Sequence, residues 1–220
     1  MKERPIIFRG STVRAILEGR KTTTRRTTGF PQEADSIEID DTLPSSHEWQ
    51  VWKDGERRPN ILCPYGIPGD ELWVRETWRY DDWTEDGDPY VRYAADDAVR
   101  LCEIPWDWDE KLADIWADLS VPSNLKRFGR ARDPKWRPSI FMPRWSSGIM
   151  LEITDVRIER LQEITEEGAQ AEGASDVREF ISLWKSINGY KAGCSWQGNP
   201  WVWCVDFRVC DADPGYLSRA

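Results

Sequence analysis

The stretch IIFRGSTVRAILEGRKTTTRR, residues 6–26, decides the fold because it places three structural signals in one run. Its short apolar start predicts a strand that ends at Gly10. Ser11 then fits the N-cap of a helix, and Gly19 is placed to end that helix in a left-handed conformation. Between them, apolar residues recur at helical spacing, at Val13, Ile16 and Leu17.

The segment GRKTTTRR, residues 19–26, holds four cations and three threonines in a chain whose formal net charge is −9. Threonine is β-branched, so the segment is expected to be extended with side chains that alternate between two faces. One interpretation is a solvated edge. The other is recognition of phosphate or carbonyl groups, which cations and hydroxyls suit well. The alternation puts Lys21, Thr23 and Arg25 on one face, and Thr22, Thr24 and Arg26 on the other.

The remaining patterns predict an α+β fold around a small mixed sheet or barrel. Strict alternation indicates strands, with a bend or bulge in the second, at ELWVRETW (71–78), IMLEITDVRIERL (149–161) and NPWVWCVDFRVC (199–210). Weaker strands are expected at EWQVWK (48–53) and PYVRYAAD (89–96). Helices are expected at 108–119, at 164–173 with Thr165 as N-cap, and at 175–189 with Asp176 as N-cap. The chain is interpreted as one domain, 1–220, with insertions at about 29–60 and 79–135.

Composition narrows the function classes. No apolar run approaches the roughly 20 residues that span a bilayer, and the first residues lack the apolar core of a signal peptide, so a cytoplasmic protein without membrane contact is expected. Five irregularly spaced cysteines and the single histidine, His47, build no zinc-ligand pattern, so no metal or cofactor is predicted and the thiols are expected to be reduced. Residues 81–118 hold thirteen acids against three bases, which argues against a general duplex binder but not against a local anion site.

Five stretches resemble, in order, the ASCH family of the PUA-like superfamily, most closely its phage and prophage members. They are residues 6–26, CPYGIPGDELWVRETW (63–78), PSIFMPRW (138–145), LEITDVRIERLQEITEEGAQAEG (151–173), and FISLWKSINGY with NPWVWCVDF (180–207). The resemblance covers the chain apart from the two insertions. It implies a small β-barrel with a cleft against its helices, and a role related to RNA or nucleotides.

One enzymatic branch of that family removes the acetyl group from N4-acetylcytidine. Its proposed catalytic residues are a Lys and a Thr in a GRKTxTxR motif, and a Glu in the helix after the long strand. By this resemblance Lys21, Thr24 and Glu172 hold the matching positions. The chemistry is reasonable: a threonine hydroxyl attacks the amide, a desolvated lysine serves as base or stabilises the oxyanion, and a glutamate orients the lysine or protonates the leaving amine.

The residues themselves suggest further ligand contacts, because tryptophan stacks on bases and arginine reaches polar edges or phosphates. Glu76 lies on the apolar face of its predicted strand and would need a partner there. The leading prediction is binding of RNA or a modified nucleotide. The alternatives are deacylation of N4-acetylcytidine-type nucleosides, a ribonuclease, and a purely structural ion pair between Lys21 and Glu172. The predicted binding residues are Arg20, Arg25, Arg26, Arg75, Glu76, Trp78, Arg144 and Trp145.

Overall fold

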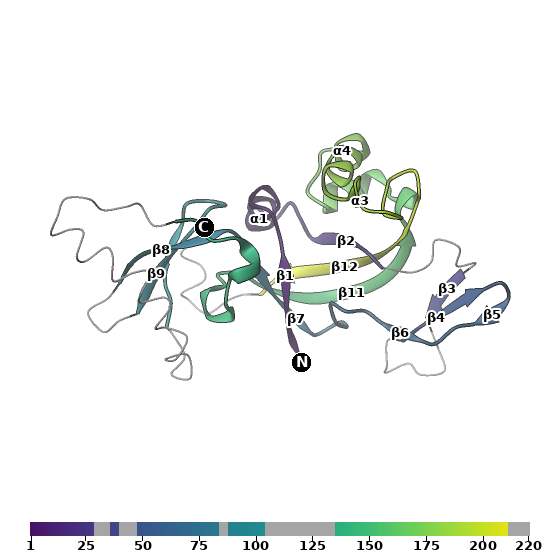
Figure 1. The fold of residues 1–220 in the computed structure, drawn as a ribbon, viewed down its shortest axis with the longest axis horizontal. Coiled ribbons are helices and arrows are strands. Elements are labelled where there is room, and N and C mark those ends of the chain that lie inside the picture. The colour runs from purple at the N-terminus through teal and green to yellow at the C-terminus, as the bar shows by residue number, and fades with distance from the viewer. Residues whose placement is uncertain (29–35, 40–47, 84–87, 104–134, 211–220) are drawn as a thin grey trace.

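A computed structural model describes residues 1–28, 36–39, 48–83, 88–103 and 135–210. These residues form a mixed α+β fold made mostly of strands with few helices, as Figure 1 shows. The central element is a five-stranded sheet with two open edges. Its order is β1 (Glu3–Ile7), β7 (Glu71–Arg75), β11 (Met150–Arg160), β12 (Trp201–Val209) and β2 (Thr23–Thr27).

Strand β11 is the central strand of this sheet, since it pairs with β12 along its length and with β7 near its start. Its register against β12 shifts between Ile153 and Asp155, which confirms the expected bulge. Strands β1 and β7 run parallel, and the other pairs are antiparallel.

The described strands form an open sheet and no closed barrel. The edges β1 and β2 are linked by a side chain: Arg26 Nη2 on β2 donates to the carbonyl oxygen of Ile7 on β1, at 2.8 Å. The ring of Phe8 lies in the same region, with the Lys21 ammonium 5.9 Å and the Arg26 guanidinium 5.1 Å from its centroid. An aromatic ring and two cations thus lie where backbone pairing would otherwise close the sheet.

Three helices lie above one face of the central sheet in Figure 1: α1 (Gly10–Leu17), α3 (Glu166–Ala171) and α4 (Val177–Asn188). Thr165 and Asp176 cap α3 and α4 by accepting hydrogen bonds from backbone amides, as predicted. The predicted cap at Ser11 is wrong. Helix α1 begins two residues earlier than predicted, at Gly10, and its N-cap position is Arg9, which makes no side-chain capping bond. Gly19 ends the turn after α1 with a φ of 70°, as expected.

Two smaller sheets flank the central one. Segment 71–78 was predicted as one strand, but it divides into β7 and β8, which belong to different sheets. The physical reason lies in the two residues between them: the Glu76 amide donates to the Met142 sulfur, and the Thr77 carbonyl accepts from the Ala94 amide. The sheets are β3 (Ser36–Ile39), β4 (Glu48–Lys53), β5 (Glu56–Arg57) and β6 (Ile61–Leu62), and then β8 (Trp78–Trp83), β9 (Pro89–Tyr93) and β10 (Val99–Leu101). Short 3-10 turns occupy Ser139–Phe141, Arg144–Ser146 and Leu161–Glu163.

The main apolar core lies against the central sheet and includes Val13 and Ile16 of α1. Trp73 and Trp203 are buried, and Trp203 meets Trp49 edge-on with 5.9 Å between ring centroids. The five cysteines form no disulfide. In the part of the chain that the structure describes, no helix is long and apolar enough to cross a membrane. The predicted helix at 108–119 and His47 fall outside the described residues.

Candidate functional site

The site begins in the connection between α1 and β2. Lys21 follows the glycine turn, and its amide donates to the carbonyl of Ala15 in α1 at 2.9 Å. An isolated antiparallel bridge then joins Lys21 to Glu172, the C-cap residue of α3. Gly173 allows this approach, because a Cβ at that position would lie 3.0 Å from the Ala15 Cβ and 3.3 Å from the Lys21 Cβ. Two segments 151 residues apart in sequence therefore meet at this point.

The Lys21 ammonium is enclosed, with only 3% of its side chain exposed. It donates to the Glu172 carboxylate, to the Thr23 carbonyl at 2.6 Å and to the Glu172 carbonyl at 3.0 Å. Those three acceptors match the three N–H donors of an ammonium. Burial lowers the pKa of Lys21 from 10.5, and the charges of Arg26 and Arg25 act the same way, against the opposing effect of Glu172. The predicted solvated edge is therefore wrong for this lysine.

Glu172 joins Lys21 to Arg25 of β2. One carboxylate oxygen accepts from Lys21, and the other accepts from the Arg25 backbone amide and lies 3.7 Å from its guanidinium. The Arg25 guanidinium also donates a hydrogen bond to the Glu159 carboxylate of β11 at 3.0 Å. Both carboxylate oxygens of Glu172 therefore accept hydrogen bonds, so this buried anion is fully hydrogen-bonded within the protein.

The ion pairs continue across the sheet. Arg157 Nε donates to Glu159 at 2.6 Å and its Nη1 donates to Asp206, which in turn accepts from the Thr23 hydroxyl at 2.6 Å. Burial raises the pKa of Glu159, but the hydrogen bonds of Arg157 and Cys204 and the charges of Arg25 and Arg157 outweigh it, and the net pKa is lowered. We call this chain the ion network; its members alternate in sign in the order Lys21, Glu172, Arg25, Glu159, Arg157 and Asp206.

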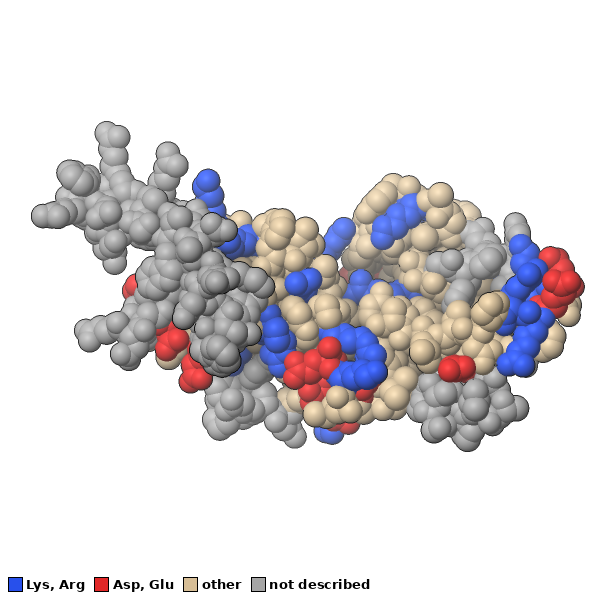
Figure 2. Space-filling model, turned by 60° about the horizontal axis from the view of Figure 1, so that its bottom comes forward, with Lys and Arg blue, Asp and Glu red and all other residues tan. Residues whose placement is uncertain are grey.

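A cavity of about 290 Å³ opens beside the network, between β2, the start of α1 and helix α4. This volume is at the lower end of the roughly 300–1,000 Å³ typical of small-molecule sites. Five cations and a single carboxylate line it, together with an apolar wall. Figure 2 shows basic side chains in the hollow between the lobe of α1 and the lobe of α3 and α4. The charged lining residues are Arg9, Lys21, Arg25, Arg26, Lys191 and Glu172, and the wall comprises Phe8, Tyr65, Phe180, Leu183, Trp184 and Ile187.

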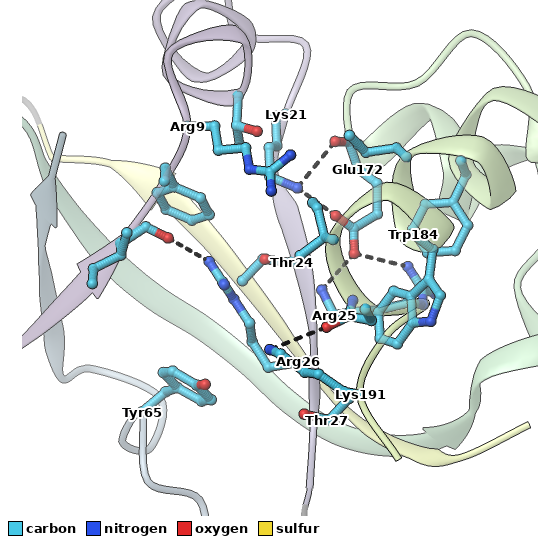
Figure 3. Close-up of a pocket in the computed structure, with 17 residues that line it drawn as sticks. Arg9, Lys21, Thr24, Arg25, Arg26, Thr27, Tyr65, Glu172, Trp184 and Lys191 are labelled. Carbon is cyan, nitrogen blue, oxygen red and sulfur yellow. Dashed lines mark hydrogen bonds and ion pairs between the residues drawn. The ribbon is translucent and has the colours of Figure 1, made fainter. Parts of the chain in front are cut away.

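Thr24 lies in the middle of this cavity in Figure 3, below Lys21 and Glu172. Its hydroxyl forms no hydrogen bond with the described residues, although the residue is only 4% exposed. Thr24 and Lys21 thus share the cavity, which differs from the predicted alternation. Lys21 precedes β2 and is held by the bridge to Glu172, so the alternation of the strand does not extend to it.

Arg26 is the most enclosed cation of the cavity after Lys21 and Arg25. Burial lowers the pKa of its guanidinium below the ordinary value, with weaker opposing effects from Tyr65 and Glu172. Its Nε–H is buried and has no acceptor among the described residues. Conversely, burial raises the pKa of Tyr65, which keeps that phenol neutral beside the cavity.

The structure therefore brings together five of the predicted site residues: Lys21, Thr24, Arg25, Arg26 and Glu172. The other six do not line this cavity. Arg20 is exposed and bonds to Glu18 and to the Gly173 carbonyl. Arg75 stacks on Trp73 and donates to the Met142 carbonyl.

The remaining four lie near the three-stranded sheet or β1. Glu76 is 1% exposed and Trp78 is 2% exposed, and Trp78 packs within the cluster of Tyr80, Val91 and Met142. Trp145 packs edge-on against Trp78 at 6.3 Å, and Arg144 pairs with Glu3 at the surface. Trp78 has no accessible face on which a base could stack.

Sequence reasoning missed Arg9, Tyr65, Trp184 and Lys191, which complete the cavity. Trp184 lies on the buried face of α4, where it packs on Phe180. Tyr65 and Lys191 belong to loops whose position depends on distant contacts. The one available signal was Arg9, which immediately precedes α1 on the same stretch as the basic segment.

Comparison with known proteins adds little to this geometry. No family model and no curated protein match the chain. Among solved structures, it is similar to protein EF3133 from Enterococcus faecalis V583, described with the family model DUF984. The two share 11% identity across 97% of this chain and 84% of that chain, with a TM-score of 0.39. A likeness of this size carries no conclusion about fold or function.

Proposed function

We propose that this protein is an ASCH-type, PUA-like domain that binds a nucleotide, free or within RNA, in the cavity between β2 and α4. The observation that carries the proposal is the lining: five cations against one carboxylate, facing an aromatic and aliphatic wall, in a chain of net charge −9. Stacking on aromatic side chains and phosphate contacts to cations are the two means by which proteins hold unpaired nucleotides. The cytoplasmic location predicted from the sequence belongs to the same proposal.

The meeting of Lys21, Thr24 and Glu172 supports the ASCH resemblance, because the matching family positions are far apart in sequence and the cavity unites them. The chain order of strand, helix and basic strand, followed by a long bulged strand and a capped helix, also agrees with the resemblance. The family assignment remains part of the proposal, without the closed barrel expected from the resemblance, because the described strands form an open sheet.

The binding test uses titration calorimetry with cytidine 5′-monophosphate and a short single-stranded RNA, at low and high salt. Leu183 lines the cavity, whereas Ser182 is exposed on the same helix and does not. Leu183→Glu should weaken binding by at least about tenfold, because it places an anion beside the ligand. Ser182→Glu, which adds the same charge outside the cavity, should leave the affinity unchanged. Equal affinities in the two variants would argue against this cavity as the binding site.

Deacylation of an N4-acylated cytidine is the second candidate, and specific geometry favours it. The Thr24 hydroxyl faces the cavity without a partner among the described residues, and burial lowers the pKa of the nearby Lys21. A lysine with a lowered pKa is a better base for activating a hydroxyl. Lys21 must first release a hydrogen bond, since its three donors already have acceptors.

The catalytic test measures cytidine released from N4-acetylcytidine by chromatography. Thr24→Val keeps the shape of the side chain and removes the nucleophile, so it should abolish release. Thr22→Val is the matched control, because Thr22 is an exposed threonine two positions away. Release that persists in folded Thr24→Val protein would remove this threonine from the mechanism. The ribonuclease alternative stays a prediction, because no described residue adds an observation for it.

A further inference from the structure

The charges around the cavity divide into two groups, and one of them is balanced. The ion network contains three cations and three carboxylates, each in contact with a neighbour of opposite sign. Its two cavity-facing cations, Lys21 and Arg25, already bond to carboxylates. Charges matched in this way attract an incoming anion only weakly. The network therefore fixes the shape of the cavity but supplies no net charge to a ligand.

Three other cations line the same cavity and are not matched. Arg9 and Lys191 are exposed, and Arg26 is half-buried. Among the described residues, none of the three forms an ion pair. Arg26 and Lys191 donate only to neutral acceptors, the Ile7 carbonyl at 2.8 Å and the Asn188 side-chain oxygen at 3.4 Å. Among the described residues, the cavity thus carries three positive charges that no carboxylate contacts.

Arg26 is the best placed of the three to contact a ligand directly. A guanidinium has five N–H donors, and Ile7 uses one of them. The Phe8 ring lies 5.1 Å from its central carbon and fixes the plane of the group. Figure 3 shows Arg26 crossing the cavity beside Thr24, while Arg9 and Lys191 lie farther out on either side. A planar, oriented guanidinium matches two oxygens of a phosphate.

We propose that Arg26 binds a terminal phosphate, with Arg9 and Lys191 adding attraction at the rim, so that the ligand is a nucleoside monophosphate or a phosphorylated RNA end. This inference rests on the proposed function, since the half-buried apolar lining of Tyr65, Leu183 and Ile187 is what would hold the base. A phosphate monoester carries roughly −1.5 to −2 near neutral pH, whereas an internal phosphodiester carries one charge. Three unmatched cations favour the monoester.

The experiment compares cytidine 5′-monophosphate, cytidine and inorganic phosphate by titration calorimetry on the full chain. The monophosphate should bind about ten- to hundredfold more tightly than cytidine, the gain expected from hydrogen bonds to a charged group. Inorganic phosphate should compete with the monophosphate weakly, because it lacks the base. Arg26→Met should remove the advantage of the monophosphate and leave the affinity for cytidine unchanged.

Lys191→Met keeps the test decisive if Arg26→Met fails to fold, because Lys191 is exposed. It should weaken monophosphate binding about two- to fivefold. Lys185→Met is the matched control, since Lys185 is an exposed lysine on α4 that does not line the cavity. Equal affinities for cytidine and its monophosphate, or no difference between Lys191→Met and Lys185→Met, would overturn the phosphate subsite and leave the proposed function standing. Absence of binding by all three probes to the folded protein would overturn both.

Discussion

Two regions of this molecule combine arginines with aromatic rings, and they use those rings differently. Beside β2, the aromatic and cationic groups surround about 290 Å³ of space. In the three-stranded sheet, the same residue types fill the space themselves: Trp78 lies 5.0 Å from the Tyr80 centroid and 5.6 Å from the guanidinium of Arg137. Composition alone therefore does not separate a binding site from a packed core.

The two regions differ in what the cations contact: aromatic rings in the three-stranded sheet, and carboxylates beside β2. In the three-stranded sheet, arginines cover rings, so the aromatic surface is used up within the protein. Beside β2, carboxylates from β11 and from the end of α3 bind Lys21 and Arg25, and the half-buried ring of Tyr65 still lines the cavity. The buried ion pairs hold the side chains of Lys21 and Arg25 in place at the edge of the cavity and leave its volume open. In the three-stranded sheet, the arginines instead pack directly on the rings.

The largest expected effect is on stability, at the centre of the ion network. Glu172→Ala leaves the Lys21 ammonium and the Arg25 guanidinium buried without that carboxylate, which should lower the free energy of unfolding by about 3–5 kcal/mol. Urea denaturation followed by tryptophan fluorescence measures it. The control is Glu167→Ala, which removes an exposed carboxylate from the same helix. A midpoint equal to that of the wild type would show that the network does not hold the cavity together.

A second prediction separates packing from binding. Trp78→Phe should lower the free energy of unfolding by about 1–2 kcal/mol, because the ring is buried in the three-stranded sheet. The affinity for cytidine 5′-monophosphate should stay unchanged. Trp184→Phe, the same replacement in the cavity wall, should lower both quantities. If Trp78→Phe alone weakened binding, the region beside β8 would be the better site.

A third and smaller effect is expected in how the free energy of unfolding depends on pH under acidic conditions. The folded-state pKa of Glu159 lies below its ordinary value of 4.5, so this carboxylate stabilises the fold above about pH 4.5. The contribution is lost as the pH falls through the lowered folded value, because the unfolded chain takes up the proton first. Glu159→Gln should flatten the rise of unfolding free energy between roughly pH 2 and pH 5. An unchanged slope in urea titrations across this range would contradict the interaction with Arg157 and Arg25.

Local rules predicted the elements well, and they failed where distant residues decide. Thr165 and Asp176 cap their helices because capping depends on a few neighbouring residues. The alternation in residues 71–78 gave no warning of the break at Glu76, which contacts from Met142 and Ala94 impose. Lys21 and Glu172 were paired by resemblance, not by spacing. Lys191 was missed because only the fold brings the end of α4 to β2.

The smallest expected effect belongs to Arg20, which the sequence placed beside Arg25 and Arg26 in the binding set. Its side chain is 55% exposed and bonds to Glu18, two residues away. An exposed pair of this kind contributes less than about 1 kcal/mol, so Arg20→Ala should change stability little and leave monophosphate affinity unchanged. Arg26→Met, in the same calorimetric series, should weaken that affinity. If Arg20→Ala weakened it as much, the basic segment would bind through its outer face, and burial would not be what distinguishes its cations.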